Sequence, residues 1–213
     1  MSGLAERLAE VQARIATAAV ASGRAPEAVT LVAVSKFHPL VAVQEAYSLG
    51  VRTFGENYAQ ELRDKAAALP DAKWHFIGRF QKNKINMLKD IVACFETVSS
   101  ADDAEALLSR APAAHMLLQV NIGLEPQKGG VTPVDVLSLA EAFPTLQGLM
   151  CIPPEGASER SFQAMAKLRH QLEDALGKPM ALSMGMSADF ELAIHCGATH
   201  VRVGSLIFGP RVR

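Results

Sequence analysis

A lysine directly follows a short apolar segment near the start of the chain. Residues 31–34, Leu-Val-Ala-Val, lead into Ser35 and Lys36, and Pro39 soon interrupts the pattern. An apolar run this short is typical of a strand buried in a parallel sheet, and α/β proteins place their chemistry at the carboxyl ends of such strands. A partly desolvated lysine amine loses its proton more readily and then attacks aldehydes. The alternative is a lysine that extends from the strand end into water.

Two segments rich in glycine and serine follow apolar runs in the last third of the chain. Glycine lets the backbone approach a ligand, and amides together with hydroxyls form an anion site. We therefore expect a phosphate site here, although two ordinary tight turns would have the same composition. Asp189 and Glu191 follow closely and would repel a phosphate unless they point away. The residues of the expected site are Ser183, Gly185, Ser187, Gly204 and Ser205.

An aldehyde that carries a phosphate would satisfy both features, and pyridoxal 5′-phosphate (PLP) is the commonest such cofactor. Arg202 lies between Val201 and Val203, so it faces the opposite side of its strand from two apolar neighbours. A guanidinium keeps its proton, so it would donate a hydrogen bond to the pyridine nitrogen and leave that nitrogen unprotonated. The alternative is an arginine that pairs with an acid at the strand end.

The remaining polar residues near strand ends have less specific interpretations. Asn57 either hydrogen-bonds the ring hydroxyl of a cofactor or caps its helix. His75 lies within an apolar strand and is best explained as a hydrogen-bonded core residue. Lys82 and Lys84 belong to a solvated helix face, and Lys128 lies in a glycine-rich loop that could cover the site. Neither a metal cluster nor a catalytic triad is predicted.

Apolar runs alternate with helical patterns along the chain, which predicts one α/β domain over residues 1–213. An open doubly wound sheet is the alternative to a closed (β/α)8 TIM barrel, but such sheets more often have five to seven strands. The expected strands are 31–36, 53–55, 74–77, 94–98, 115–122, 146–152, 179–183 and 200–203. The expected helices are 40–49, 57–69, 81–88, a segment from Ser100, 133–142, 158–176 and 188–196. A further helix over 3–22 precedes the first strand and would pack outside the barrel or close its bottom.

Composition restricts the partners and the compartment. The 213 residues carry a net charge of -1, which provides no electrostatic attraction for nucleic acid or an anionic membrane. We see neither a signal peptide nor an apolar span of membrane length. The three cysteines are far apart and read as buried free thiols. We therefore expect a cytoplasmic protein.

Eight motifs together resemble the pyridoxal phosphate homeostasis protein family, also called the proline synthetase co-transcribed family. That family is similar in fold to the barrel domain of alanine racemase, which is fold type III of the PLP proteins. The resemblance extends from about Leu4 to Arg211. The departures are small: Phe37-His38 after the lysine, Phe80 where leucine is common, and a short segment after Pro154. The motifs are 33–36 (AVSK), 54–58 (FGENY), 74–78 (WHFIG), 81–84 (QKNK), 119–122 (QVNI), 148–150 (GLM), 182–187 (LSMGMS) and 201–211 (VRVGSLIFGPR).

The resemblance implies a role for each candidate residue. Lys36 would hold PLP covalently as the internal aldimine, with Asn57 near the ring and Arg202 on the pyridine nitrogen. Ser183, Gly185, Ser187, Gly204 and Ser205 would surround the phosphate. The implied activity is binding of PLP for intracellular vitamin B6 homeostasis, with supply of PLP to PLP-dependent apo-enzymes and without robust catalytic turnover. Because no second domain is predicted beside the barrel, we expect a monomer.

Two alternatives remain open from the sequence. An amino-acid racemase needs a second acid/base on the ring face opposite the lysine, and Tyr58 is the one candidate. A Schiff-base aldolase would need no cofactor and would be colourless. The carrier is preferred because Tyr58 begins a helix and is better suited to shaping the pocket.

Overall fold

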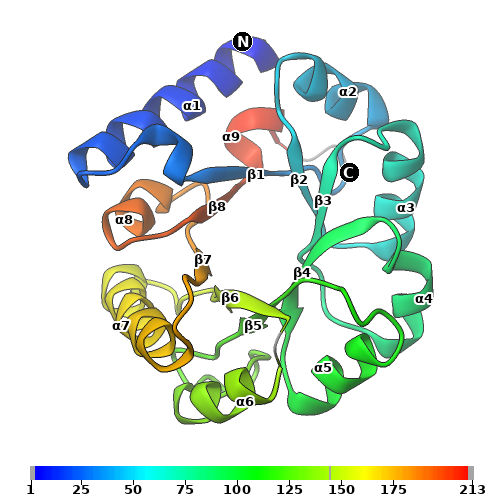
Figure 1. Cartoon of the computed structure of the whole chain (residues 1–213). Coiled ribbons are helices and arrows are strands. Elements are labelled where there is room, and N and C mark those ends of the chain that lie inside the picture. The colour runs from blue at the N-terminus through cyan, green and yellow to red at the C-terminus, as the bar shows by residue number, and fades with distance from the viewer. Residues whose placement is uncertain (1–2, 144, 211–213) are drawn as a thin grey trace.

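The structure is a closed barrel of eight parallel strands in sequence order, with β8 paired back to β1 (Figure 1). The computed structural model describes residues 3–143 and 145–210, so Arg211, the end of the last motif, lies outside the described residues. The predicted (β/α)8 barrel is confirmed, and the open sheet is wrong. The strands are β1 (Thr30–Val34), β2 (Thr53–Glu56), β3 (Lys73–Phe76), β4 (Val92–Val98), β5 (Met116–Gln119), β6 (Leu146–Met150), β7 (Ala181–Ser183) and β8 (His200–Val203).

Helices form a ring around the strands (Figure 1). They are α1 (Leu4–Ala21), α2 (Leu40–Ser48), α3 (Ala59–Ala68), α4 (Ile85–Leu88), α5 (Ala101–Leu108), α6 (Val136–Ala142), α7 (Ser158–Leu176), α8 (Phe190–His195) and α9 (Ser205–Phe208). Short 3-10 turns are η1 (Pro26–Ala28), η2 (Lys82–Lys84) and η3 (Pro133–Asp135). Among the described residues, no helix is both long and apolar enough to cross a bilayer.

Several predicted bounds differ from the structure by a few residues, and two elements show the physical reason. The helix expected over 81–88 is a 3-10 turn followed by a single α-helical turn. The strand expected over 115–122 ends at Gln119, because the following residues pair with the returning loop. Val120 bridges to Val131, and the amide of Asn121 donates to the Val131 carbonyl. The apolar pattern of the sequence therefore extends past the end of β5 into the loop.

Helix α1 packs on the outside of the barrel, which resolves the two placements open from the sequence. It lies beside α8 and α9 (Figure 1). Arg14 forms two hydrogen bonds with the carboxylate of Glu191, at 2.7 and 2.9 Å. Arg7 donates to the Ile207 carbonyl at 2.8 Å. This added helix thus supports the two elements that follow β7 and β8.

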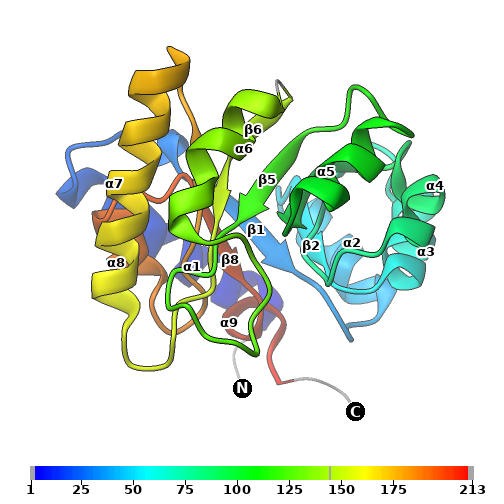
Figure 2. The ribbon, with the colours of Figure 1, turned by 90° about the horizontal axis from the view of Figure 1, so that it is seen from below.

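Most of the apolar core lies between the barrel wall and the helices. Successive side chains along a strand point to opposite sides, so every second side chain faces the helices and the others face the barrel interior. On β8, Val201 and Val203 belong to the outer core, and the interior holds a small apolar cluster of Cys94, Leu117 and Met150. Polar side chains also meet in the interior, among them Glu96 and Arg202. Figure 2 shows α9 and the loop after β5 at the same end of the barrel, which is the end that carries the site.

Candidate functional site

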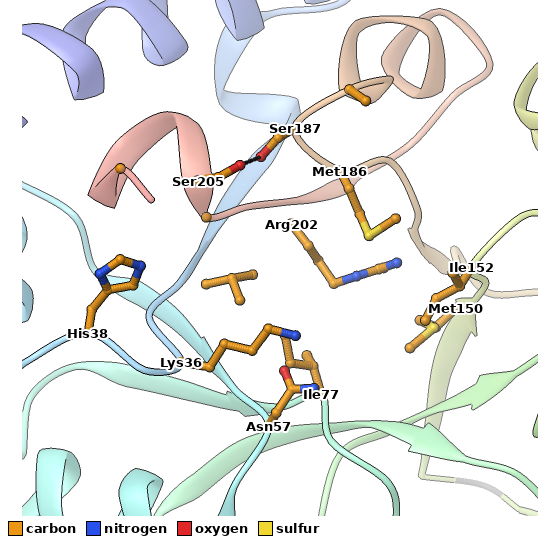
Figure 3. Close-up of a pocket in the computed structure, with 14 residues that line it drawn as sticks. Lys36, His38, Asn57, Ile77, Met150, Ile152, Met186, Ser187, Arg202 and Ser205 are labelled. Atoms are coloured by element: carbon orange, nitrogen blue, oxygen red, sulfur yellow. Dashed lines mark hydrogen bonds between the residues drawn. The ribbon is translucent and has the colours of Figure 1, made fainter. Parts of the chain in front are cut away.

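A cavity of about 330 Å³ opens at the carboxyl ends of the strands (Figure 3). Six of the eight candidate residues line it, from the segments that follow β1, β2, β7 and β8 and from β8 itself: Lys36, Asn57, Ser187, Arg202, Gly204 and Ser205. Its other lining residues are Val34, His38, Ile77, Met150, Ile152, Met186, Ala188 and Gly209. Barrel closure therefore brings the first third of the chain beside the last.

Lys36 lies just beyond the end of β1, and its side chain extends into the cavity toward Asn57 (Figure 3). Both neighbours of Lys36 are fastened to the protein. The carbonyl of Ser35 accepts a hydrogen bond from Lys65 at 2.7 Å, and the amide of Phe37 donates to Glu61 at 2.8 Å. Phe37 has a φ of 65°, which a residue with a side chain rarely adopts. The backbone that carries the amine is thus held on both sides.

Asn57 does not cap helix α3, because the N-cap position is occupied by Tyr58. The capping alternative is therefore wrong. Among the described residues, the Oδ1 atom of Asn57 is buried and has no hydrogen-bond partner. A buried polar atom without a partner costs free energy, so this atom is suited to a donor on a bound molecule.

Ser187 and Ser205 bring the two predicted phosphate segments together. Their hydroxyl oxygens are 3.1 Å apart at the rim of the cavity (Figure 3). The two nearby acids are engaged elsewhere: Asp189 accepts hydrogen bonds from the Ser158 hydroxyl and the Met186 amide, while Glu191 pairs with Arg14. These partners therefore reduce the repulsion that we expected between the two carboxylates and a phosphate.

Ser183 and Gly185 are the two candidate residues that the structure places outside the cavity lining. Both are buried. Gly185 has a φ of 89°, and a Cβ atom there would lie 2.5 Å from the Cβ of Ala193 and 2.9 Å from the Cα of Phe190. Glycine at this position allows the loop to pack closely on α8. The Ser183 hydroxyl is already bonded within the barrel, to Glu96 and Arg202.

Arg202 reaches the cavity from the barrel interior, where its guanidinium is almost completely buried. Nη1 donates to the Ser183 hydroxyl at 2.6 Å, and Nη2 donates to the Cys151 carbonyl at 2.8 Å. Glu96 Oε2 lies 3.8 Å from Nη1. Arg202 therefore lines the cavity, as predicted, and also lies near an acid, although that acid is inside the barrel and not at a strand end.

Glu96 is the centre of this interior network and was missed from the sequence. Its other carboxylate oxygen bonds Nδ1 of His75 at 2.6 Å, so His75 is the hydrogen-bonded core residue expected. Burial would raise the pKa of Glu96, but the hydrogen bond and charge of His75, with the charge of Arg202, lower it to about 2. The signal available in the sequence was a carboxylate in the middle of an apolar strand.

His200 lies beside this network with its ring centroid 5.8 Å from that of His75. Burial is the main reason that the pKa of His200 falls to about 4, and the neighbouring His75 and Arg202 lower it further against the opposing charge of Glu96. The imidazole is therefore neutral near pH 7. The interior thus holds an ionised carboxylate, a guanidinium and a neutral histidine at close range.

The remaining polar candidates lie outside the cavity. Tyr58 is 49% exposed, and its ring packs against Phe37. Lys82 is partly exposed and pairs with Asp102, and Lys84 lies in a separate depression beside the mouth. Lys128 is tied to its surroundings, because its amine donates to the Pro153 carbonyl at 2.9 Å.

Comparison with known proteins identifies the family. Residues 8–212 match the model of the alanine racemase N-terminal domain. The chain is 45% identical to the pyridoxal phosphate homeostasis protein of Pseudomonas aeruginosa, over 99% of this chain and 97% of that protein. It is 43% identical to the protein of the same name from Schizosaccharomyces pombe, over 86% and 84% of the two chains.

A solved structure agrees with this result. PipY of Synechococcus elongatus, solved with PLP bound, superposes with a TM-score of 0.82 at 34% identity, and the match covers 97% of this chain and 100% of that one. The fold, the length and the sequence thus agree over nearly the whole chain. The protein therefore belongs to the pyridoxal phosphate homeostasis proteins, within the family defined by the alanine racemase N-terminal domain.

Proposed function

We propose that this protein binds PLP in the cavity at the barrel mouth, as a Schiff base on Lys36, and acts in intracellular vitamin B6 homeostasis. The observation that carries the proposal is that the Lys36 amine and the Ser187–Ser205 hydroxyl pair belong to one cavity. An aldehyde that carries a phosphate needs an amine and an anion site within one cavity. PipY, which is 34% identical to this chain, was solved with PLP bound, and this supports the binding of PLP.

The residues present fit the cofactor. The partnerless Oδ1 of Asn57 suits the ring hydroxyl, and the two serine hydroxyls, with the backbone at Gly204, suit the phosphate. Arg202 suits the pyridine nitrogen because a guanidinium only donates hydrogen bonds. The hydroxyl of Ser183 is already bonded and Gly185 is packed on α8, so we propose that these two residues support the phosphate segment from behind.

When bound, PLP supplies an electrophilic aldehyde and an electron-withdrawing ring. The chain's own residues hold it: Lys36 through its amine, Asn57 and Arg202 through hydrogen bonds to the ring, and the two serines through the phosphate. A ring nitrogen that accepts from Arg202 stays unprotonated, and an unprotonated ring withdraws electrons less strongly.

The placement of Tyr58 supports a carrier over a racemase. Its side chain is not among those that line the cavity, and its ring packs at a tilt against Phe37 on the exterior, whereas a second acid/base would have to reach into the cavity. The proposal therefore contains no catalytic residue. It includes a single PLP-binding domain over residues 1–213, a monomer, a cytoplasmic location and delivery of PLP to apo-enzymes.

The first test is chemical. Purified protein loaded with PLP should absorb in the visible, lose that band on borohydride reduction, and carry the reduced label on the peptide that contains Lys36. The control is Lys82→Ala, which removes a partly exposed amine outside the cavity and should label normally. A colourless protein that borohydride links covalently only to a sugar phosphate would support the aldolase.

The second test separates carrier from racemase. The loaded protein is incubated with alanine and with serine in deuterated water, and exchange at Cα is compared with a Lys36→Ala control. The carrier predicts no exchange above the control. Exchange well above it would assign racemase activity and overturn the carrier.

A further inference from the structure

The buried carboxylate of Glu96 contacts side chains from three other strands. It belongs to β4, and its partners are His75 on β3, Ser183 on β7 and Arg202 on β8. In a closed barrel of eight strands, β4 and β8 lie on opposite sides. The contact between Glu96 and Arg202 therefore crosses the barrel interior. A carboxylate with a 0% exposed side chain in such a place needs a reason, because burial of a charge is costly.

Ser183 links the carboxylate to the guanidinium in one defined direction. A hydroxyl has a single proton, and the Ser183 hydroxyl lies 2.6 Å from Glu96 Oε2 and 2.6 Å from Arg202 Nη1. An ionised carboxylate can only accept, so the proton points to Glu96 and a lone pair is left for Arg202. Glu96 thus fixes the orientation of the group that receives the Arg202 hydrogen bond.

Both terminal nitrogens of Arg202 are held by the protein, Nη1 by Ser183 and Nη2 by the Cys151 carbonyl. Neither of these bonds uses Nε–H. A guanidinium is planar, so fixing its two terminal nitrogens also fixes the direction of the third donor. Arg202 lines the cavity (Figure 3). A guanidinium N–H held in one direction there can donate a hydrogen bond to the nitrogen of a bound ring.

His75 completes the arrangement from the other side. Its Nδ1 lies 2.6 Å from Glu96 Oε1, and because the ionised carboxylate only accepts, Nδ1 carries the proton. Each carboxylate oxygen therefore receives a hydrogen bond from a different strand. This double support prevents Glu96 from turning toward one partner at the expense of the other.

We propose that Glu96 is a positioning residue for Arg202, acting through Ser183 to aim the guanidinium so that the ring nitrogen of bound PLP is kept unprotonated. This inference rests on the proposed function. Glu96 itself is not among the residues that line the cavity, so it acts on the cofactor only through Arg202. A purely structural role would require only that the interior be filled, which apolar side chains accomplish at lower cost.

The experiment uses the full chain loaded with PLP labelled with ¹⁵N at the ring nitrogen. The ¹⁵N chemical shift of that atom reports its protonation, and dialysis reports the rate of cofactor release. The variants are Ser183→Ala, which removes only the link, and Glu96→Gln, which removes the charge. Arg202→Ala is the reference for loss of the donor. Thr97→Val is the matched control, because it removes a buried hydroxyl from the same strand as Glu96, where Thr97 donates to the Gly78 carbonyl at 2.5 Å.

In the native protein and in Thr97→Val, we expect the ¹⁵N shift of an unprotonated nitrogen. In Ser183→Ala and Glu96→Gln, we expect the shift to move toward the protonated position and release to be about 10-fold faster, the effect of one charge-assisted hydrogen bond. Ser183→Ala keeps every charge, so it provides the test even if Glu96→Gln does not fold.

Three outcomes overturn the inference and point to different causes. A native shift in Ser183→Ala and Glu96→Gln, with an altered shift in Arg202→Ala, makes Glu96 purely structural while the proposed function stands. A native shift in Arg202→Ala as well removes Arg202 from the ring nitrogen. Failure of the native protein to retain PLP defeats the proposed function itself.

Discussion

The amine of Lys65 lies 2.7 Å from the carbonyl oxygen of Ser35, the residue immediately before Lys36. The same amine contacts Glu56 at 2.6 Å and Glu61 at 2.8 Å, and the Lys65 side chain is almost completely buried. Burial raises the pKa of Glu56, and the charge and hydrogen bond of Lys65 oppose that rise. A second lysine, on α3, therefore holds the strand end that presents the first.

Replacing Lys65 by methionine should destabilise the protein strongly. The change leaves a buried carboxylate at Glu56 without its cation, which typically costs about 3–5 kcal/mol. Urea unfolding followed by circular dichroism measures the difference. Lys73→Met is the matched control, because that lysine is exposed at the start of β3, and its change should be within about 0.5 kcal/mol. Equal midpoints for the two variants would show that the buried ion pair does not stabilise the fold.

Alanine at Ser187 or Ser205 should weaken PLP binding. Each substitution would remove one hydrogen bond from a serine hydroxyl to the charged phosphate. We therefore expect the dissociation constant for PLP to rise about 10-fold for each change. Fluorescence titration of apo-protein gives these constants, and inorganic phosphate should compete with loading. Ser109→Ala, at the C-cap of α5, serves as the control. If phosphate does not compete, the anion site lies elsewhere.

Alanine at Gly185 should destabilise the protein more than alanine at Gly156. Both glycines have positive φ, at 89° and 72°, so both substitutions strain the backbone. At Gly185 the new methyl group would also collide with Ala193 and Phe190, whereas nothing lies within 4 Å at Gly156. We expect the free energy of unfolding, measured from unfolding curves, to fall by about 3 kcal/mol in Gly185→Ala and by about 1 kcal/mol in Gly156→Ala. Equal losses would mean that α8 moves to accommodate the methyl group.

Stability should fall between pH 6.5 and pH 4 because of His200. Its pKa is about 4 in the folded protein and 6.5 in an unperturbed histidine, so only the unfolded chain takes up this proton in that interval. The contribution is fully present above pH 6.5 and amounts to about 3 kcal/mol before other groups act. Unfolding free energies of native protein and His200→Gln, measured at half-unit steps of pH, give the slope of stability against pH for each protein. Parallel curves would contradict the lowered pKa.

Glu96 should produce a second loss of stability in stronger acid. Its pKa is lowered from 4.5 to about 2, so the stabilisation is present above pH 4.5 and is lost as the pH falls toward 2. The midpoint of thermal unfolding, measured at pH 5, 4 and 3, should fall more steeply with falling pH in native protein than in Glu96→Gln. Identical declines would mean that Glu96 is not ionised in the fold.

Local pattern in the sequence determined the order and type of nearly every element, because apolar runs and helical spacing are properties of neighbouring residues. Helix α7 spans Ser158–Leu176 as expected, and Ser100 accepts the capping hydrogen bond from the Asp103 amide at the start of α5. Since parallel strands end at one edge of a barrel, the same order also predicted that Lys36 would lie near Ser187 and Ser205. What each residue binds remains a prediction.

Only the tertiary structure decided which polar groups meet inside the barrel. Glu96 and Arg202 are 106 positions apart and lie on strands that do not pair, so neither spacing nor periodicity relates them. Their contact depends on the register of the closed sheet, in which Val32 pairs with Arg202 and Met150 with Ser183, and on the side of each strand that faces inward. The same closure moved Ser183 below the cavity while leaving Ser187 at its rim, because successive side chains along a strand and its loop face different ways.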